Sequence, residues 1–332
     1  MELHVRNVNG AISEALWYMK SAGIEEDSRS GKVLVAPEPV MTTYAKPCER
    51  VLFWGVRDAN PIFHLMEAIW MLAGRKDLRF PEYFNSRMRN FSDDGMTLNG
   101  AYGWRWRRAF SVDQVTRIID HLQEAPNSRR AVLTMWGVAH DFRKIDESAD
   151  VCCNTQAYFD LRHGALNMTV LNRSNDMIWG AYGANVVHFS ILQEFVASAL
   201  GAEVGVYRQF SNNFHAYTGL YNLQKYIEIP PDPSDYDYYA MCGMQPRPLM
   251  TKRDQWAAFL VECELFCDDP FNQQVHYEHE FFPEVAIPMA RIALARKTKI
   301  TDGSDWLPRI AAEDWQTAAK EWIMRRNNAR KD

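Results

Sequence analysis

The sequence has no apolar run long enough to cross a lipid bilayer, and its first residues lack the basic stretch and apolar run of a secretory signal. Internal repeats and low-complexity segments are also absent. Neither sign of charge dominates, since the formal net charge is −5 for 332 residues. These absences predict a cytoplasmic protein (or one in the host cytoplasm, if its source is a virus) that requires neither a membrane nor a nucleic acid as a partner.

Cysteine is scarce, with six residues in the chain, of which Cys152 and Cys153 are adjacent. A disulfide between neighbours is strained, and a cytoplasmic thiol stays reduced. No two cysteines have the CxxC spacing of a zinc site, so we expect no metal. The pair is therefore either buried core or contains a nucleophile. An arginine cluster nearby would lower the pKa of a thiol and favour the second interpretation.

Apolar periodicity and turn residues predict helices and strands that do not alternate regularly. Asn60, Pro61 and Gly74 are the start and end signals of a helix over 60–74. We expect a hairpin over 157–172 with its turn at 162–164, strands over 129–138 and 204–211, and helices over 186–200, 216–228, 252–268, 284–297 and 313–328. Residues 230–239 are rich in turn formers and are expected to form an exposed loop. The pattern predicts an α+β fold with a mixed, mainly antiparallel sheet and flanking helices.

Arginines stand at the ends of the expected strands. Arg129 and Arg130 precede one strand, and Arg173 and Ser174 follow another. Guanidinium groups bind phosphate oxygens in a bidentate way, and a hydroxyl group adds a further donor. A solvated surface charge is the simpler interpretation of any one of these arginines. Four such positions together favour a phosphorylated substrate.

Several ordered motifs resemble the thymidylate synthases and the related deoxypyrimidine nucleotide hydroxymethylases. The matching segments are MEAIWMLAG (66–74), LNGAYGWRWR (98–107), NSRRAVLTMW (127–136), CN (153–154), LNRSND (171–176) and NNFHAY (212–217), within residues 50–228. Cys153 lies twenty residues before Arg173, which reproduces the family's spacing, whereas Cys152 does not. The resemblance implies a thymidylate synthase-like fold with a catalytic domain at 1–240. Residues 241–332 would be a mainly helical C-terminal extension packed on the same domain.

The resemblance also implies which residues catalyse. Cys153 would add to C6 of the pyrimidine, which makes C5 nucleophilic. Glu67 would organise water and assist proton transfer. It stands within the apolar run FHLMEAIWML, so we expect a buried carboxylate rather than an exposed helix residue. Asn185 would read the base, and Tyr102 would belong to the catalytic centre.

The substrate-binding residues follow from the same resemblance. Arg173 and Ser174 would bind the 5′-phosphate of a deoxypyrimidine monophosphate, and Asp176 would lie near the base and the folate. His215 and Tyr217 would hold the sugar 3′-hydroxyl, with both side chains on one face of an extended segment. Further phosphate ligands would be Arg29 on a mobile loop and, from the second subunit of a homodimer, Arg129 and Arg130.

The expected base and product depend on details of the motifs. In the family an asparagine at Asn185 accompanies uracil, although a turned amide also pairs with cytosine. The segment between Asp176 and Asn185 is one residue longer than in the synthases. Three departures concern water: Asn154 replaces a histidine, residues 78–91 lack a tryptophan-rich segment, and the C-terminus MRRNNARKD is charged where the synthases have an apolar lid.

We therefore predict a dUMP 5-hydroxymethylase that uses 5,10-methylenetetrahydrofolate and ends its reaction with water instead of hydride. A thymidylate synthase and a dCMP hydroxymethylase remain as alternatives. A more remote alternative is an inactive paralogue that binds a nucleotide or RNA through the same arginines.

Overall fold

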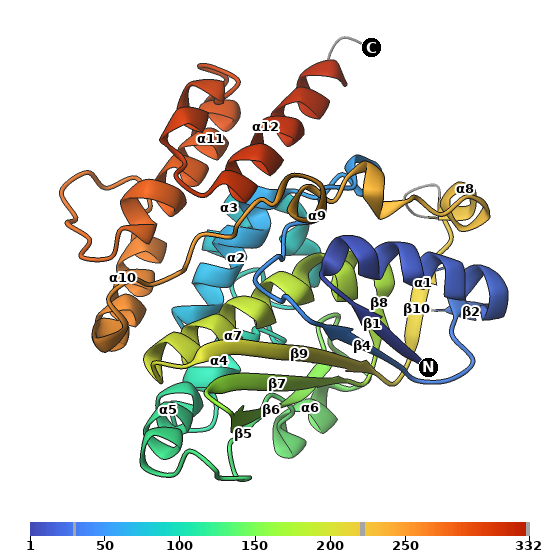
Figure 1. Cartoon of the computed structure of the whole chain (residues 1–332), viewed down its shortest axis with the longest axis horizontal. Helices are drawn as coiled ribbons and strands as arrows, with labels where there is room; N and C mark the ends of the chain where they lie inside the picture. Colours follow the sequence, from blue (N-terminus) through green and yellow to red (C-terminus); the bar gives the residue numbers. More distant parts are fainter. Residues whose placement is uncertain (29–30, 220–222, 330–332) are drawn as a thin grey trace.

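Two β-sheets form the centre of the computed structural model, which describes residues 1–28, 31–219 and 223–329 (Figure 1). The six-stranded sheet has the order β1 (Glu2–Val5), β4 (Val40–Tyr44), β9 (Glu203–Ser211), β7 (Ala165–Asn172), β6 (Asn154–Arg162) and β5 (Val132–Thr134). The β1–β4 and β9–β7 pairs are parallel, and the other three pairs are antiparallel. The expected α+β class with a mixed, mainly antiparallel sheet is thus confirmed.

The smaller sheet joins the N-terminal part of the chain to the segment after β9. Its order is β2 (Ile24–Ser28), β3 (Gly31–Val35), β10 (Phe214–Tyr217) and β8 (Asn175–Asp176). β8 and β10 leave the larger sheet directly after β7 and β9, and they pair in parallel with each other. The start of β6 and the ends of β7 and β9 therefore meet β8 and β10 at one edge, where most candidate site residues lie.

Helices cover one face of the six-stranded sheet. α1 (Val8–Ala22) contacts β1, and α7 (Val186–Ala199) contacts β7 and β9 (Figure 1). On the other face, every second residue of β7 remains partly exposed, while the residues between them are buried. This alternation is typical of a sheet with one face packed on the core and a second face free for solvent or a partner.

α2 (Pro61–Leu72) is buried at all of its positions, as expected for a helix that is apolar on every side. The Asn60 side chain accepts a hydrogen bond from the Phe63 amide at 3.1 Å, and Pro61 occupies the first turn. α2 packs between α7 and the three C-terminal helices α10 (Trp256–Asp268), α11 (Ile287–Thr298) and α12 (Glu313–Asn328) (Figure 1). The helices expected at 60–74, 186–200, 252–268, 284–297 and 313–328 are thus all present.

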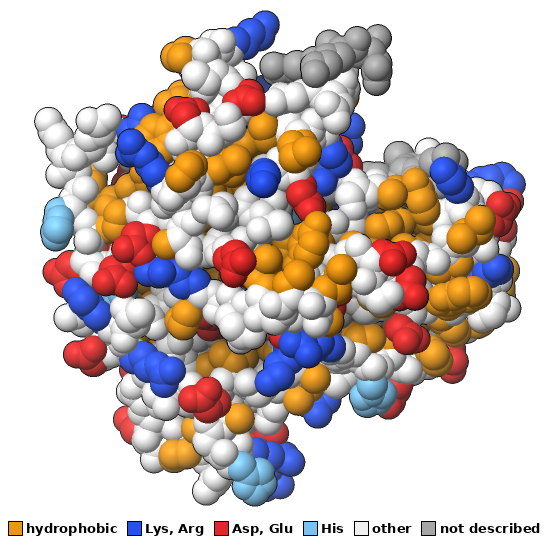
Figure 2. Space-filling model, turned by 45° about the horizontal axis from the view of Figure 1, so that its top comes forward, with side chains coloured by type: hydrophobic (Ala, Val, Ile, Leu, Met, Phe, Trp, Pro, Cys, Tyr) orange, Lys and Arg blue, Asp and Glu red, His pale blue; other side chains and the backbone are white. Residues whose placement is uncertain are grey.

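The remaining helices are short. They are α3 (Arg79–Phe84), α4 (Tyr102–Arg107), α5 (Gln114–Glu124), α6 (Val138–Lys144), α8 (Leu223–Glu228) and α9 (Tyr238–Cys242). The expected hairpin is formed by β6 and β7, with a two-residue turn at His163 and Gly164, which both have positive φ. None of the helices within the described ranges combines the length and apolar character that a bilayer-spanning segment needs. Figure 2 shows acidic and basic side chains interspersed over one face, which agrees with the small net charge.

Three expectations for local structure are wrong. The strand expected over 129–138 is limited to Val132–Thr134. The helix expected over 216–228 begins only at Leu223, because residues 214–217 pair with β3 and β8 as a strand. Residues 230–239 are an exposed turn only around Asp232, Ser234 and Asp235. Tyr236 and Tyr239 are buried, and their hydroxyls donate to Asn9 O at 2.9 Å and Asp314 Oδ2 at 2.8 Å, because packing of the two rings outweighs the turn propensity.

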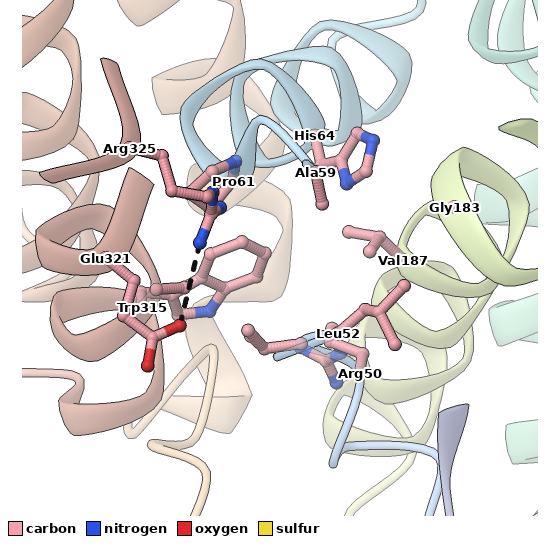
Figure 3. Close-up of a pocket in the computed structure, with 12 residues that line it drawn as sticks. Arg50, Leu52, Ala59, Pro61, His64, Gly183, Val187, Trp315, Glu321 and Arg325 are labelled. Atoms are coloured by element: carbon pink, nitrogen blue, oxygen red, sulfur yellow. Dashed lines mark ion pairs between the residues drawn. The ribbon is translucent and has the colours of Figure 1, made fainter. Parts of the chain in front are cut away.

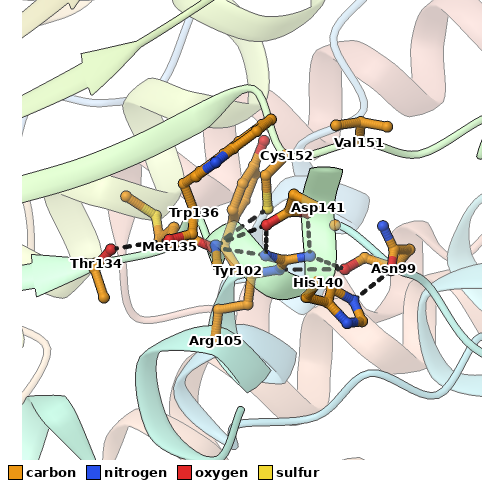
Figure 4. Close-up of polar contacts among 12 residues, drawn as sticks. Asn99, Tyr102, Arg105, Thr134, Met135, Trp136, His140, Asp141, Val151 and Cys152 are labelled. Carbon is orange, nitrogen blue, oxygen red and sulfur yellow. Dashed lines mark hydrogen bonds and ion pairs between the residues drawn. The ribbon is translucent and has the colours of Figure 1, made fainter. Parts of the chain in front are cut away.

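A buried ion pair holds α4 in place. Arg105 and Asp141 are 1% and 0% exposed, and Nη1 and Nη2 of Arg105 donate to the two carboxylate oxygens at 2.6 and 2.9 Å (Figure 4). The same guanidinium donates to Met135 O at 2.7 Å and to Asn99 O at 2.8 Å. All of its charge is thus paired inside the protein, which links α4 to the segment after β5 and to α6.

We predict that Asp141→Asn destabilises the fold by about 3–5 kcal/mol, because it leaves the Arg105 cation buried without a counter-ion. Asp160→Asn is the matched control. Asp160 pairs with Arg162 in the open, where the two side chains are 42% and 68% exposed, and its loss changes stability by less than about 1 kcal/mol. Urea unfolding of both variants measures the difference. Equal midpoints for the two variants would contradict the prediction.

Candidate active site

The thiol of Cys153 lies at the edge of the sheet, directly before β6. The backbone N–H groups of Cys153 and Asn154 donate to the Tyr102 hydroxyl oxygen at 3.1 and 3.3 Å. Nη2 of Arg173, which follows β7, is 3.7 Å from the Cys153 Sγ atom. The antiparallel register of Asn154 with Asn172 makes this contact possible, because it sets the residues before β6 beside those after β7.

Arg173 also fixes the backbone that carries the thiol. Its Nε atom donates to Cys152 O at 2.7 Å, and Nη2 donates to Val151 O at 2.9 Å. The guanidinium carbon lies 6.0 Å from the centre of the Trp136 ring. The residue as a whole remains exposed, so a guanidinium already oriented by these contacts still faces solvent.

The expectation that arginines lower the pKa of the thiol needs a correction. Burial raises the pKa of Cys153 above its usual value, and the positive charge of Arg173 opposes this rise without overcoming it. Asp150 adds to the rise through its negative charge. Burial also raises the pKa of Asp150 itself, to about 6, and its Oδ2 atom accepts from the Gly100 amide at 2.6 Å. Burial therefore favours the neutral thiol, and the charge of Arg173 favours the thiolate.

Cys152 is a core residue. It is 0% exposed, and its Sγ atom faces Met135 O at 3.8 Å, beside the Arg105–Asp141 pair (Figure 4). Burial raises its pKa far above the usual range for a thiol. The two neighbours therefore point into different environments, and Cys153 is the one that a substrate in solution can reach.

Glu67 is buried on α2, as expected, and has a partner that the sequence analysis missed. Its Oε2 atom lies 3.1 Å from Nε2 of His188 on α7, and the two side chains are 8% and 2% exposed. His188 follows Asn185 by three residues, so both side chains lie on the same face of the chain where it enters α7. A carboxylate and an imidazole together can hold a water molecule and take its proton.

Asn185 belongs to a group of buried amides. Its Oδ1 atom accepts from Nδ2 of Asn154 at 3.3 Å, and its own Nδ2 donates to Oδ1 of Asn175 at 3.0 Å. The chain enters α7 through a π-helical segment, Met177–Asn185, which is interrupted by a kink with non-helical backbone at Tyr182.

His215 and Tyr217 share one side of β10, as the spacing predicts. Their ring centres are 5.4 Å apart and nearly perpendicular, and the His215 Nδ1 atom lies 2.8 Å from Asn213 Oδ1. His215 is opposite Asp176 in the parallel pairing of β10 with β8. The Asp176 carboxylate accepts from the amides of Ile178 and Trp179 at 3.0 and 3.2 Å, while its burial raises its pKa.

The other predicted phosphate ligands are not all assembled. Ser174 is partly buried next to Arg173. Arg129 and Arg130 are exposed before β5, and within the described ranges neither side chain forms an ion pair. Arg29 lies outside the described residues. Among the residues that the structure describes, no cluster of three or more side chains is arranged to hold a metal ion.

A small cavity lies between α2, α12 and the start of α7. It is lined by residues that include His64, Gly183, Val187, Trp315 and Arg325, and its volume of about 10 Å³ suits a single water molecule (Figure 3). Burial lowers the pKa of His64 well below the usual value, with the charge of Arg57 as a smaller cause. Sequence reasoning missed His188, which stands in the apolar run of α7, and Asn175, which is the unassigned position of the LNRSND motif.

The chain is similar to known proteins over most of its length. The family model described as thymidylate synthase matches residues 42–259. The chain is 45% identical to the deoxyuridylate hydroxymethyltransferase of Pseudomonas phage M6, over 98% of this chain and 95% of that protein. It is 37% identical to the protein of the same name from Bacillus phage SP01, over 75% and 70% of the two chains. The crystal structure of thymidylate synthase from T4 phage matches with a TM-score of 0.54 at 20% identity, over 67% of this chain and 80% of that one, which supports the fold.

We predict that a small alkylating reagent modifies Cys153 at least about tenfold faster than Cys152 in the native protein, because Cys152 is sealed in the core. Cys242 is exposed and provides an internal reference, which reacts before either of them. Peptide mass spectrometry over a time course measures the three rates. If Cys152 and Cys153 are alkylated at similar rates in the folded protein, then Cys152 is not buried as the structure has it.

Proposed function

Because the chain belongs to the thymidylate synthase family, we propose that it is a dUMP 5-hydroxymethylase with Cys153 as the nucleophile. The names of the two phage relatives support this activity. The position of Cys153, partly exposed and 3.7 Å from an arginine, supports the role of the thiol. 5,10-Methylenetetrahydrofolate supplies the one-carbon unit when it is bound.

The reaction begins when the Cys153 thiolate adds to C6 of the uracil ring. The C5–C6 double bond then supplies the electron pair with which C5 bonds to the one-carbon unit. Transfer of the C5 proton to a base, with cleavage of the bond between the one-carbon unit and the folate nitrogen, would leave an exocyclic methylene group on C5. Water adds to this carbon and gives up a proton, and the sulfur leaves C6 as the double bond re-forms.

The observation that carries the water step is the buried pair of Glu67 and His188, with 3.1 Å between Oε2 and Nε2. Both ring nitrogens of His188 are buried without a hydrogen-bond partner in the described part of the chain, and burial of such groups is costly unless a further group, such as a water molecule, bonds to them. We propose that the pair orients the attacking water and accepts its proton.

The π-helical segment suits a pterin. The Asp176 carboxylate can accept hydrogen bonds from the N–H groups of such a ring, and the Trp179 side chain, partly exposed, offers a flat surface. We propose that Asp176 orients the folate, while Asn185 contacts the edge of the uracil. His215 and Tyr217 would hold the 3′-hydroxyl of the sugar.

We propose a homodimer in which the partly exposed face of the six-stranded sheet meets its symmetry mate. Arg129 and Arg130 are exposed and lack ion-pair partners in the described ranges, which suits a role in the phosphate site of the other subunit. Residues 1–240 would then contain the site. Residues 241–332 would support α2, and thereby Glu67, from behind.

We predict that Cys153→Ser abolishes turnover, with a loss of more than about 10³-fold, while dUMP still binds, because a hydroxyl group is far harder to ionise than a thiol. Cys152→Ser keeps substantial activity, since that side chain does not face the substrate. Steady-state rates and calorimetric binding of dUMP measure both effects. If Cys152 instead proves essential for turnover, the assignment of Cys153 as the nucleophile is wrong.

We predict that dUMP and methylenetetrahydrofolate give 5-hydroxymethyl-dUMP and tetrahydrofolate. In water enriched in heavy oxygen, the product hydroxyl group carries the label, because water supplies that oxygen. Mass spectrometry of the nucleotide and absorbance of the folate provide independent measurements. Unlabelled dTMP formed together with dihydrofolate would instead identify a thymidylate synthase.

A further inference from the structure

Three buried amides and one hydroxyl group form a continuous line of hydrogen bonds. Asn154 donates to Asn185, Asn185 donates to Asn175 and Asn175 donates to the Ser211 Oγ atom, at 3.3, 3.0 and 3.0 Å. The four residues come from β6, the last position before α7, β8 and the end of β9. Their exposed fractions are 0%, 8%, 3% and 2% along the line. Water therefore does not compete for these groups, and each amide depends on its neighbours.

The direction of one amide fixes the direction of the others. If Asn185 alone were turned over, its oxygen would face the Asn175 oxygen and its NH₂ group would face the Asn154 NH₂ group. Both contacts would be repulsive, so the three amides can only turn together. A reversal of the whole line is compatible with Ser211, because a hydroxyl group can donate as well as accept.

The free end of the line decides between the two directions. In the structure, the buried Oδ1 atom of Asn154 has no hydrogen-bond partner in the described part of the chain. After reversal, the NH₂ group of Asn154 would take that place without an acceptor. A buried unpaired N–H group is rarer in proteins than an under-satisfied carbonyl. The observed direction is thus the more stable one.

Gly180 packs directly against the side-chain amides of Asn175 and Asn185. A side chain at this position would place a Cβ atom 2.7 Å from Asn175 Oδ1 and 3.4 Å from Asn185 Nδ2. The backbone of the π-helical segment therefore lies directly on the two amides, in a space that only glycine allows. This contact restricts rotation of the two amides, while one lone pair and one N–H of the Asn185 amide are not used within the line.

We propose that Asn154 and Asn175 are positioning residues that hold the Asn185 amide in one orientation, and thereby set the preference for uracil over cytosine nucleotides. The inference rests on the proposed function, in which Asn185 contacts the edge of the base. Uracil presents a donor at N3 and an acceptor at O4, and cytosine presents an acceptor and a donor at these positions. An amide that cannot turn over matches only one of the two bases.

The test replaces each of the two hydrogen-bond partners of Asn185, Asn154 and Asn175, by aspartate in turn. An aspartate at position 154 can only accept, so Asn154→Asp forces Asn185 to turn its NH₂ group toward the new carboxylate and reverses the line. Asn175→Asp accepts from Asn185 as Asn175 already does, with the Ser211 hydroxyl as a second donor, so it keeps the orientation. Both variants add one negative charge to the same buried line.

We expect Asn154→Asp to shift the ratio of kcat/KM for dUMP over dCMP toward dCMP by at least about tenfold, and Asn175→Asp to stay within about threefold of the wild type. Assays at several pH values up to about 9.5 favour ionisation of the introduced carboxyl groups, because burial raises the pKa of an aspartate at either position. A charge near the thiol slows both substrates alike and cancels in the ratio. Calorimetry in a Cys153→Ser background measures the ratio of the dissociation constants of dUMP and dCMP, which reports the base preference without the chemical steps.

Several outcomes would overturn the inference. These are equal shifts for both aspartate variants, an unchanged ratio for folded Asn154→Asp, and a wild type that prefers dCMP. If Asn154→Asp does not fold, Asn154→Leu removes the donor to Asn185 and must reduce the preference for dUMP. A wild type that binds neither nucleotide refutes the proposed function and this inference with it. A wild type that prefers dUMP, with variants that do not diverge, refutes the inference alone.

Discussion

The buried guanidinium of Arg105 is the contact on which the geometry of the site depends. It pairs with Asp141 and donates to the carbonyl groups of Met135 and Asn99. Asn99 in turn donates to Asp150 O at 2.8 Å, and its neighbour Gly100 donates to the Asp150 side chain. The segment before Cys153 is therefore attached to α4 through one cation. The same helix begins at Tyr102, whose hydroxyl oxygen accepts from the amides of Cys153 and Asn154.

Burial and charge act in opposite directions on the reactive groups. Removal from water raises the pKa of Cys153, Asp150 and Asp176, because each ionised form is poorly solvated inside the protein. Arg173 opposes this effect at the thiol, while it also binds two carbonyl groups of the same segment. The contacts of one arginine therefore both orient the backbone before β6 and oppose the effect of burial on the thiol.

The site achieves polarity without buried net charge where the base is expected to lie. Three asparagines satisfy one another at 3.3 and 3.0 Å, and Ser211 ends their line. Glu67 and His188 form a second polar pair between α2 and α7. Both groups connect elements that are otherwise apolar, so their geometry is set by helix and strand packing. Rigid placement of this kind is what selective recognition of a base and of one water molecule requires.

The sequence by itself determined the elements whose signals are local. The caps and apolar run of α2, the hairpin of β6 and β7 and the helix α7 were predicted close to their observed bounds, because capping and periodicity act within a few residues. The spacing from Cys153 to Arg173 also identified two residues that do come together. The motifs of the family identified Glu67, Asn185, His215 and Tyr217 as candidates without showing their partners.

Only the tertiary structure decided which distant groups meet. His188 approaches Glu67, and Asn175 binds Asn185, because α2, α7 and β8 pack together. Residues 214–217 became a strand because β3 and β8 offered hydrogen-bond partners, and Tyr236 and Tyr239 were buried because α1 and α12 offered acceptors. The pKa of Cys153 likewise depends on burial by segments far along the chain. Local propensity contains no information about such contacts, since their free energy arises only when the segments lose water together.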